Sequence, residues 1–393
     1  HSVTDPELKS RYAQTYRRIR AVTALDLYTV VFELTETHAT FITDLELPIL
    51  SRHYRHKRIT MDMAAQILSS GAYTLCAKQQ NVLSLCRNPH WHKGKARAAH
   101  VRLMVVRDDN TRAMRLLAGA ADLALNAVPP LLVPLFERDS QFKVMSSPGV
   151  GTTYMGVRTD QAMLSDPRIR QAIAYAIDRV SLIRAKFGGR ASIARGFIPE
   201  GHWAYDKALP LYAYQPERAR MLIDYARRDG VEFRRLRLRT SADRLRLSIG
   251  RAIAAMLHDV GIDVDVWPSE TATLLDDLRE GRYDLAILAL PEVYEPHVLS
   301  WFFGSDHIPS KTTVGANRWR YRNPRLDGLF AEGVRHTDLE ERRAVYDQVQ
   351  QILAKNLPAI PLWHEDNVAV VRTRSLPYYR VPRDGRFGTL ATP

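Results

Sequence analysis

The sequence is poor in cysteine, poor in lysine, and free of long apolar runs. Two cysteines among 393 residues exclude a disulfide-rich scaffold and a cysteine-rich zinc module. No run of about eighteen apolar residues occurs, so no membrane-spanning helix is expected. The N-terminus HSVTDPELKS lacks the charged-then-apolar plan of a signal peptide. We expect the chain as given to be soluble, with any export signal removed or not included.

Acidic residues are the minority among the charged ones, and the formal net charge is +13. Of the 56 basic residues only 10 are lysine, a skew that base composition of the coding DNA explains as well as function does. In the densest basic stretch, 227–251, Arg235, Arg237 and Arg239 alternate with leucines, which is the period of a strand with one solvated face. We favour that interpretation over a polyanion site and expect no nucleic-acid partner.

Motifs of common enzyme classes are missing. Neither a G-x-S-x-G elbow nor a G-x-x-x-x-G-K-[ST] phosphate loop occurs. The segment GVGTTYMG at 149–156 precedes a strand, whereas a dinucleotide loop follows one. His53 and His56, and also His90 and His92, form pairs without a third ligand nearby in the sequence. We therefore expect no enzyme, no cofactor and no metal site.

Cys76 and Cys86 flank an expected hairpin turn near Gln80 and Asn81. A three-residue loop would make the cysteines cross-strand neighbours, which permits a disulfide. A two-residue turn would put them out of register. The sequence alone leaves both possibilities open.

Apolar patterning alternates between strand and helix periods along most of the chain, which predicts an α/β protein with two or more lobes. A strand over 100–108, a helix over 110–122 and a strand over 122–128 form an expected βαβ unit with parallel pairing. The remaining predictions are helices at 11–20, 39–50, 216–230, 244–261, 272–281 and 339–356, and strands at 27–34, 152–158, 233–240, 262–268, 283–290 and 359–373.

The segment SDPRIRQAIAYAIDR at 165–179 has clear helix-start signals. Ser165 or Asp166 can cap the helix, and Pro167 suits its first position. Apolar residues recur at three and four positions, so we expect one docked helix over 166–186 that ends at Gly188–Gly189.

Polar residues follow two of the expected strands. Ligands of open α/β sheets gather outside the carboxyl ends of strands. The strand 283–290 leads into Glu292, Tyr294, Glu295 and Trp301. The strand 233–240 leads into Arg239, Thr240, Ser241 and Arg244. Carboxylates opposite arginines, with aromatics between them, would suit a zwitterion, and the alternative is a surface loop with a helix cap.

An ordered set of segments spanning roughly 11–390 resembles the family 5 extracellular solute-binding proteins, which are dipeptide- and oligopeptide-binding receptors of bacterial ABC importers. The segments are SGAYTL…RNPHWHKG, VRDDNTRAMRLLAGAADLAL, YMGVRT…SDPRIRQAIAYAIDR, YQPERARMLI, VGIDVDV, GRYDLAIL and NLPAIPLW.

This resemblance implies a two-lobed, periplasmic-binding-protein-like (type II) fold with a hinge and a small extra domain, incomplete at the N-terminus. Residues 1–60 would be the remnant of the small domain, 61–140 with 366–393 the first lobe, and 141–365 the second lobe. Asp166, Arg168 and Arg170 would be caps and lobe-surface charges at the start of the second lobe.

The resemblance also implies capture of a small solute, with a short peptide favoured, between two closing lobes. Glu292 falls where the family's aspartate holds the ligand's α-amino group, although the usual tryptophan is replaced by aliphatic residues. Arg239 or Arg244 would meet a carboxylate. The full candidate set is Glu292, Tyr294, Glu295, Trp301, Arg239, Thr240, Arg244 and Tyr154.

The expected partner is the membrane permease of an ABC importer, with a monomeric protein in the periplasm or anchored as a cell-surface lipoprotein. Two alternatives stay open at this point. One is a receptor for a nickel chelate, haem or a sugar. The other is the ligand-sensing lobe pair of a transcriptional regulator.

Overall fold

The structure is a computed structural model that describes residues 13–46, 54, 70–290, 292–310 and 312–391. The chain divides into two compact units: unit 1, residues 1–147 with 367–393, and unit 2, residues 148–366. The chain thus passes from one unit to the other after Ser147 and again after Asp366. The sequence places these crossings after residues 140 and 365, and a separate small domain over 1–60 stays a prediction.

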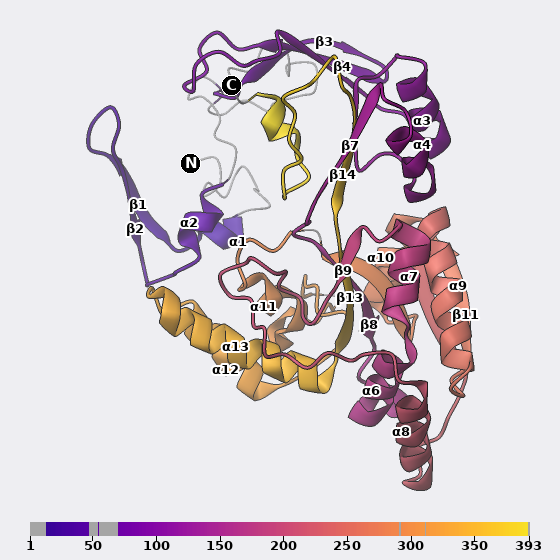
Figure 1. The fold of residues 1–393 in the computed structure, drawn as a ribbon. Helices are drawn as coiled ribbons and strands as arrows, with labels where there is room; N and C mark the ends of the chain where they lie inside the picture. The colour runs from indigo at the N-terminus through magenta and orange to yellow at the C-terminus, as the bar shows by residue number, and fades with distance from the viewer. Residues whose placement is uncertain (1–12, 47–53, 55–69, 291, 311, 392–393) are drawn as a thin grey trace. The chain divides into compact units, whose positions relative to one another are not determined.

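Unit 2 is built on a six-stranded mixed sheet with the strand order β11-β10-β12-β8-β13-β9 (Figure 1). β10 pairs in parallel with both β11 and β12, and the pairs β12–β8, β8–β13 and β13–β9 are antiparallel. All six residues of β8 are buried, as expected for a central strand covered on both faces. The strands are β8 (Thr152–Val157), β9 (Ala191–Ile193), β10 (Leu236–Ser241), β11 (Val264–Ser269), β12 (Leu285–Leu290) and β13 (Ala359–Glu365).

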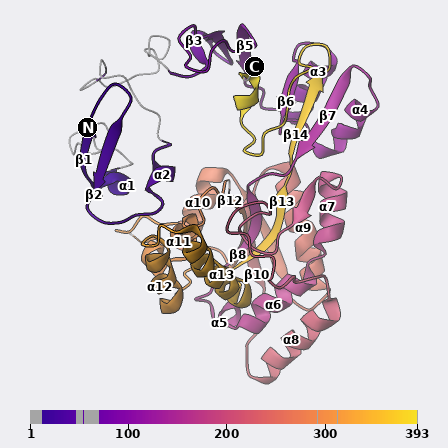
Figure 2. The same ribbon diagram turned by 60° about the vertical axis from the view of Figure 1, so that its left-hand side comes forward.

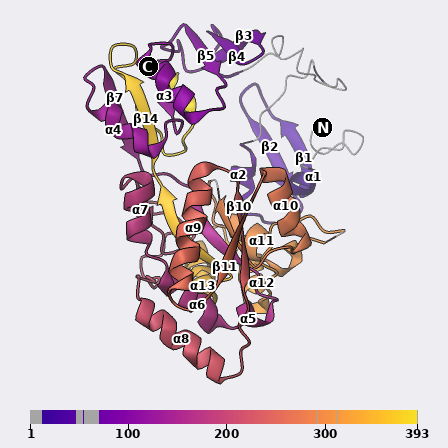
Figure 3. The ribbon, with the colours of Figure 1, turned by 90° about the vertical axis from the view of Figure 1, so that its right-hand side faces the viewer.

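Helices cover both faces of this sheet. One apolar core joins the sheet to α6, α7, α8 and α9, and a second core joins its other face to α10, α11, α12 and α13. Figure 2 shows the strands between α7 and α9 on one side and α11 to α13 on the other, and Figure 3 shows α9 and α10 on opposite sides of β10. The helices are α5 (Ala162–Ser165), α6 (Pro167–Ala176), α7 (Arg179–Phe187), α8 (Pro216–Arg228), α9 (Arg244–His258), α10 (Thr271–Glu280), α11 (Val298–Phe303), α12 (Pro324–Gly333) and α13 (Leu339–Asn356).

The single helix predicted over 166–186 is two helices in the structure. Asp166 caps α6 by accepting a hydrogen bond from the Arg168 amide, but the backbone is extended at Ile177 and Asp178 caps a new helix, α7. The expected stop is confirmed, because Gly188 ends α7 in the left-handed conformation with φ 60°. The prediction that Arg170 is a surface charge is wrong, since that residue is only 3% exposed.

The described residues of unit 1 form three small sheets, with strand orders β1-β2, β3-β4-β5 and β6-β14-β7. The last of these packs one face on α3 and α4 and the other on the C-terminal segment around Tyr379 and Leu390. Its elements are α1 (Ala13–Tyr16), β1 (Ile19–Ala24), β2 (Val30–Leu34), α2 (Phe41–Asp44), β3 (Tyr73–Gln79), β4 (Val82–Arg87), β5 (His100–Met104), α3 (Asp109–Leu117), β6 (Leu123–Leu125), α4 (Val133–Glu137), β7 (Phe142–Ser147) and β14 (Asn367–Arg372).

The βαβ unit predicted over 100–128 is wrong in its pairing. Strand, helix and strand are present, but β5 pairs with β4 and β6 pairs antiparallel with β14. Local patterning predicts the element type but carries no information about a partner more than two hundred residues away. The helix expected over 11–20 is likewise short, because β1 begins at Ile19. Of the helix expected over 39–50, the end beyond residue 46 lies outside the described residues.

Cys76 and Cys86 form a disulfide across the β3–β4 hairpin, with Cα atoms 5.8 Å apart. The turn has two residues, because Gln79 pairs with Val82. That turn alone would put the cysteines out of register, but a β-bulge between Leu75 and Ala77 shifts β3 at Cys76. A bulge adds one residue to one strand; here that residue is Cys76, while Cys86 pairs in register with Thr74.

Candidate functional site

The carboxyl ends of β10 and β12 lie at one edge of the unit 2 sheet, because the two strands are parallel neighbours. The antiparallel β8 begins at this edge and β13 ends there. Thr153 lies between Ala289 of β12 and Trp363 of β13. Such an edge is where open α/β sheets bind ligands.

Four side chains at this edge, Thr153, Arg246, Trp363 and Glu365, form what we call the edge cluster. Its centre is Oε1 of Glu365, which lies 2.7 Å from Arg246 Nη1, 2.7 Å from Thr153 Oγ1 and 3.3 Å from Trp363 Nε1. The side chains of Arg246 and Glu365 are 25% and 32% exposed. The cluster therefore presents a partly open ion pair with a hydroxyl beside it.

Local structure explains how these side chains arrive at the edge. Asp243 caps α9 and accepts a hydrogen bond from the Arg246 amide at 3.0 Å, which fixes Arg246 in the first helical turn. The register of β13 shifts between Pro361 and Trp363. Bulges re-aim the residues that follow them, and Glu365 follows this one.

His364 lies next to the edge cluster but is 6% exposed. Its Nδ1 lies 3.0 Å from Thr152 Oγ1 and 3.1 Å from the Gly151 carbonyl. The Thr152 hydroxyl donates to the Phe197 carbonyl at 2.9 Å, so Nδ1 carries a proton and donates. Burial lowers the pKa of His364 below its ordinary value. The neutral imidazole thus ties the end of β13 to the start of β8.

We expect His364 to make unit 2 less stable in acid. Between its ordinary pKa of about 6.5 and its lower folded pKa, the unfolded chain holds the extra proton, so the free energy of unfolding falls as the pH drops, by at most about 1.4 kcal/mol per pH unit. In His364→Asn the side-chain amide replaces the Nδ1 donor and this loss should disappear. Urea unfolding at pH 7.5 and 5.5 measures the difference.

His336→Asn is the control for this measurement. Its hydrogen bond to Glu341 raises the pKa of His336, so His336 contributes stability at low pH that is lost as the pH rises through its folded pKa. Removing His336 should therefore increase the stability lost between pH 7.5 and pH 5.5, whereas removing His364 should decrease it. An acid loss in His364→Asn equal to that of the wild type would contradict the assignment.

Four of the residues predicted from sequence lie at or next to this edge. Glu292 is half-buried just after β12, and the neighbouring Val293 amide donates to the Val150 carbonyl at 3.2 Å. Arg244 is exposed at the first position of α9. Tyr294 is 37% exposed, and its carbonyl lies 3.1 Å from His202 Nε2. Thr240 is fully buried, and its hydroxyl has no partner among the described residues.

Tyr154 and Arg239 belong to the interior of unit 2. Tyr154 is 2% exposed and packs edge-on against Phe197 and Trp319. Burial raises the pKa of its phenol far above the usual value. Arg239 makes a 2.5 Å ion pair with Asp277 of α10 and lies over the Trp267 ring. Both have structural partners in place.

Glu295 and Trp301 are also separate from the edge cluster. Glu295 makes a 2.5 Å ion pair with Arg342 of α13, and the two side chains are 14% and 8% exposed. Trp301 is 40% exposed on α11, with its ring 4.8 Å from that of His307. Glu295 in the loop before α11 thus contacts α13, while Trp301 lies on α11 itself, so residues close in sequence do not share one site.

Sequence reasoning missed Thr153, Arg246, His364 and Glu365. The signal for the last two is visible in AIPLWHEDNVAVV at 359–371, where His, Glu and Asp interrupt an otherwise apolar run. Nothing local marks Thr153 and Arg246, because only the sheet brings β8, α9 and β13 together at this edge.

Two searches of the described residues return nothing. No three His, Cys, Asp or Glu side chains there are placed to hold a metal ion. No helix there has both the length and the apolar character needed to cross a bilayer.

Comparison with known proteins places the chain in a family of solute-binding proteins. The family model of bacterial extracellular solute-binding proteins, family 5 Middle, matches residues 1–308. The chain is 28% identical over 327 residues to probable di/tripeptide-binding protein 5 of Pseudomonas aeruginosa, covering 81% of this chain and 60% of that protein. It is 24% identical to haem-binding protein A of Haemophilus influenzae, covering 93% and 68%.

A solved structure shares the fold. The ABC transporter substrate binding protein CtaP of Listeria monocytogenes superimposes with a TM-score of 0.87 at 20% identity, covering 99% of this chain and 81% of that one. The α/β class predicted from sequence is confirmed. The chain spans about 60% of the length of the di/tripeptide-binding relative. On the extent of the family match, this chain belongs to the bacterial extracellular solute-binding proteins of family 5.

Proposed function

We propose that this protein captures a small solute, with a short peptide as the favoured class, and presents it to the membrane permease of an ABC importer. Family membership together with the polar edge of the unit 2 sheet carries the proposal. A role in capture rather than catalysis agrees with the solute-binding family. Capture by closure of two lobes, expected from the resemblance, stays a prediction.

In the proposed site Glu292 binds the ligand's ammonium group and the exposed Arg244 meets a carboxylate. The edge cluster adds a second acceptor, because the side-chain contacts of Glu365 with Arg246, Thr153 and Trp363 all use Oε1, and no described donor meets Oε2. Arg246 pairs with Glu365, and Glu292 is the acidic residue that the family resemblance assigns to the ligand's amine.

The energetics require more than one contact. A micromolar receptor needs about 8 kcal/mol of net binding free energy. One charge-assisted hydrogen bond contributes about 1.5–3 kcal/mol. The remainder has to come from enclosure of the ligand and from hydrogen bonds to its backbone. Contacts of this kind are compatible with a family that binds chemically different solutes.

Glu292→Gln should weaken peptide binding about 10- to 100-fold, because it removes one charge-assisted contact. Isothermal titration against a di- to pentapeptide library measures this effect. Glu217→Gln is the matched control, since Glu217 is 85% exposed on α8. Unchanged affinity in Glu292→Gln would remove Glu292 from the site.

Absence of heat and of any thermal shift across the whole library would reject the peptide version. The next ligands to titrate would then be haem and Ni(L-His), because one relative is named for haem and one structural neighbour was solved with Ni(L-His).

We further propose that the protein acts outside the cytoplasm, in the periplasm or as a lipoprotein, because the Cys76–Cys86 disulfide persists in oxidising compartments.

A further inference from the structure

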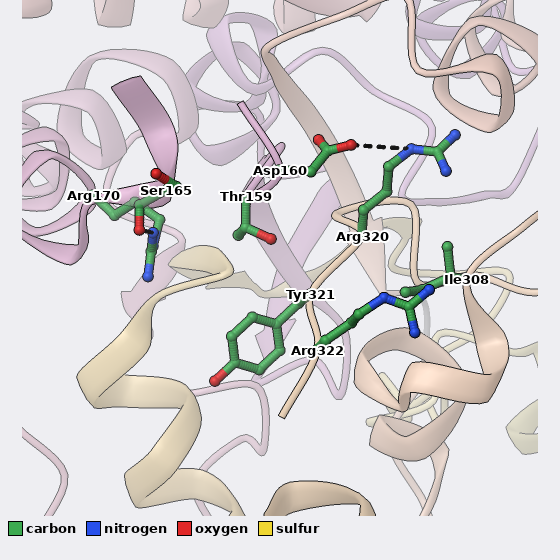
Figure 4. Close-up of a pocket in the computed structure, with 8 residues that line it drawn as sticks. All are labelled: Thr159, Asp160, Ser165, Arg170, Ile308, Arg320, Tyr321 and Arg322. Atoms are coloured by element: carbon green, nitrogen blue, oxygen red, sulfur yellow. Dashed lines mark hydrogen bonds and ion pairs between the residues drawn. The ribbon is translucent and has the colours of Figure 1, made fainter. Parts of the chain in front are cut away.

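A cavity lies at the opposite end of the unit 2 sheet from the edge cluster. Thr159 and Asp160 line it just after β8 ends, whereas the edge cluster lies where β8 begins. At about 3.4 Å per residue the two places are about 20 Å apart along the strand. The cavity holds about 430 Å³ and is drawn in Figure 4. Its lining is Thr159, Asp160, Ser165, Arg170, Ile308, Arg320, Tyr321 and Arg322.

One wall of the cavity comes from the segment RWRYR at 318–322. Trp319 and Tyr321 are buried, while Arg318 and Arg320 are partly exposed and Arg322 is exposed. The aromatic residues and arginines alternate through a turn at Arg318 and Trp319, where the Arg320 amide donates to the Asn317 carbonyl at 3.3 Å. The two rings therefore lie in the core, while the arginines are the more exposed residues of the segment.

A buried asparagine fixes this segment. The Asn317 side chain is fully buried, donates to the carbonyls of Gly304 and Tyr321, and accepts from the Tyr321 amide at 3.2 Å. Arg320 adopts a left-handed backbone with φ 56°, which is uncommon for a residue other than glycine. The wall is thus held in a conformation that the arginine itself does not favour.

Positive charge in the cavity exceeds its described counter-charge. Arg170 is 3% exposed, and its Nε and Nη1 donate only to the backbone carbonyls of Asn356, Leu164 and Ser165. No described carboxylate lies within ion-pair distance of Arg170, and no described acceptor meets its Nη2. Burial lowers the pKa of this guanidinium. Buried charges in proteins are ordinarily paired.

Arg320 and Arg322 are also short of carboxylates. Nε of Arg320 is buried without a hydrogen bond and lies 3.9 Å from Asp160 Oδ2. Asp160 already makes a 2.8 Å ion pair with Arg158. Arg322 is exposed and has no described partner. Among the described contacts Asp160 therefore reaches only Arg320 of the three cavity arginines, while Asp166, whose charge acts on Arg170, is already paired with Arg168.

The arrangement of these groups suggests two ends of one site. In Figure 4, Arg170 and Ser165 lie on one side, Arg320, Arg322 and Ile308 lie on the other, and Tyr321 lies between them. The Tyr321 hydroxyl accepts from Asn323 Nδ2 at 2.9 Å and keeps its own proton to donate. Guanidinium groups bind phosphate and carboxylate oxygens especially well.

We propose that this cavity binds a small polyanion that carries two phosphate or carboxylate groups, one held by Arg170 and the other by Arg320 and Arg322. The volume exceeds what a single phosphate ion fills. The site is separate from the proposed solute site and uses none of its residues. Its occupancy would supply the missing counter-charge for Arg170.

Isothermal titration with pyrophosphate and with citrate, at constant ionic strength, tests the proposal and separates phosphate from carboxylate ligands. We expect saturable 1:1 binding of at least one probe by the wild-type chain. Arg322→Ala should weaken it about tenfold or more, because it removes a charge-assisted contact. Tyr321→Phe keeps the buried ring and should weaken it several-fold.

Arg251→Ala is the charge-matched control, since Arg251 is exposed on α9 in the same unit, and its effect should be less than twofold. Absence of saturable binding at millimolar probe would overturn the proposal. Equal weakening by Arg251→Ala and Arg322→Ala would overturn it as well, because binding would then reflect net charge alone. None of these titrations uses a peptide, so failure of the polyanion proposal can be distinguished from failure of the proposed solute-binding function.

Discussion

Gly156→Ala is expected to destabilise unit 2 by about 3 kcal/mol or more, at the upper end of overpacking effects. A Cβ at this position would lie 1.8, 2.3 and 2.4 Å from three ring atoms of Trp319. Trp319 is fully buried and packs edge-on against Tyr154, so the ring has no free space to enter. The glycine is required by close approach of the indole and not by its backbone conformation.

Denaturant unfolding of matched variants tests this expectation. Gly328→Ala is the control, because Gly328 is in helix α12 and nothing lies within 4 Å of its added Cβ. That change should be neutral or stabilising by up to about 1 kcal/mol, since alanine favours helix over glycine. Trp319→Leu combined with Gly156→Ala should cost less than the sum of the two single changes by more than about 1 kcal/mol. Simple additivity would show that the indole is not the obstacle.

Glu295→Ala should cost about 3–5 kcal/mol of stability, because it leaves a buried guanidinium without its carboxylate. Arg342 is 8% exposed on its side chain. It lies between Trp203 and Tyr346, 5.1 and 5.7 Å from their ring centroids, and donates to the Gly333 carbonyl at 3.1 Å. None of these neighbours replaces the negative charge that Glu295 supplies.

Comparison with an exposed pair isolates the effect of burial. Glu217→Ala breaks the ion pair with Arg220, whose side chain is 42% exposed, and should change stability by less than about 1 kcal/mol. Glu295→Ala with Arg342→Met removes both buried charges and should recover a large part of the loss. If Glu295→Ala unfolds at the wild-type denaturant concentration yet loses ligand binding, Glu295 belongs to the binding site after all.

Sequence patterning located most of the elements of unit 2 because their signals are local. Helix 339–356 has the predicted bounds in the structure, with Asp338 as its cap and acidic residues in its first turn. The alternation predicted around Arg237 and Leu238 appears as alternating burial in β10. Helix 166–186 failed at one point, where Asp178 caps a second helix inside an apolar pattern that continues through it.

Prediction of the site residues was weaker, because side chains near one another in sequence take different partners. Glu292 and Glu295 are three residues apart, yet Glu295 is committed to α13 while Glu292 follows β12 at the sheet edge. Arg239 follows the expected strand pattern but pairs with Asp277. A carboxylate's role depends on which cation reaches it, and that cation is contributed by a distant helix.

By itself the sequence determined the α/β class, the family resemblance, the Asp166 cap and the bounds of several unit 2 helices, since each is recorded in the order and local patterning of the residues. Only the tertiary structure decided the pairing of β6 with β14, the burial of Arg170, the contacts among Thr153, Arg246 and Glu365, and the packing of Trp319 against Gly156. The physical reason is that these contacts join segments 90 to 250 residues apart, where no local periodicity records the partner.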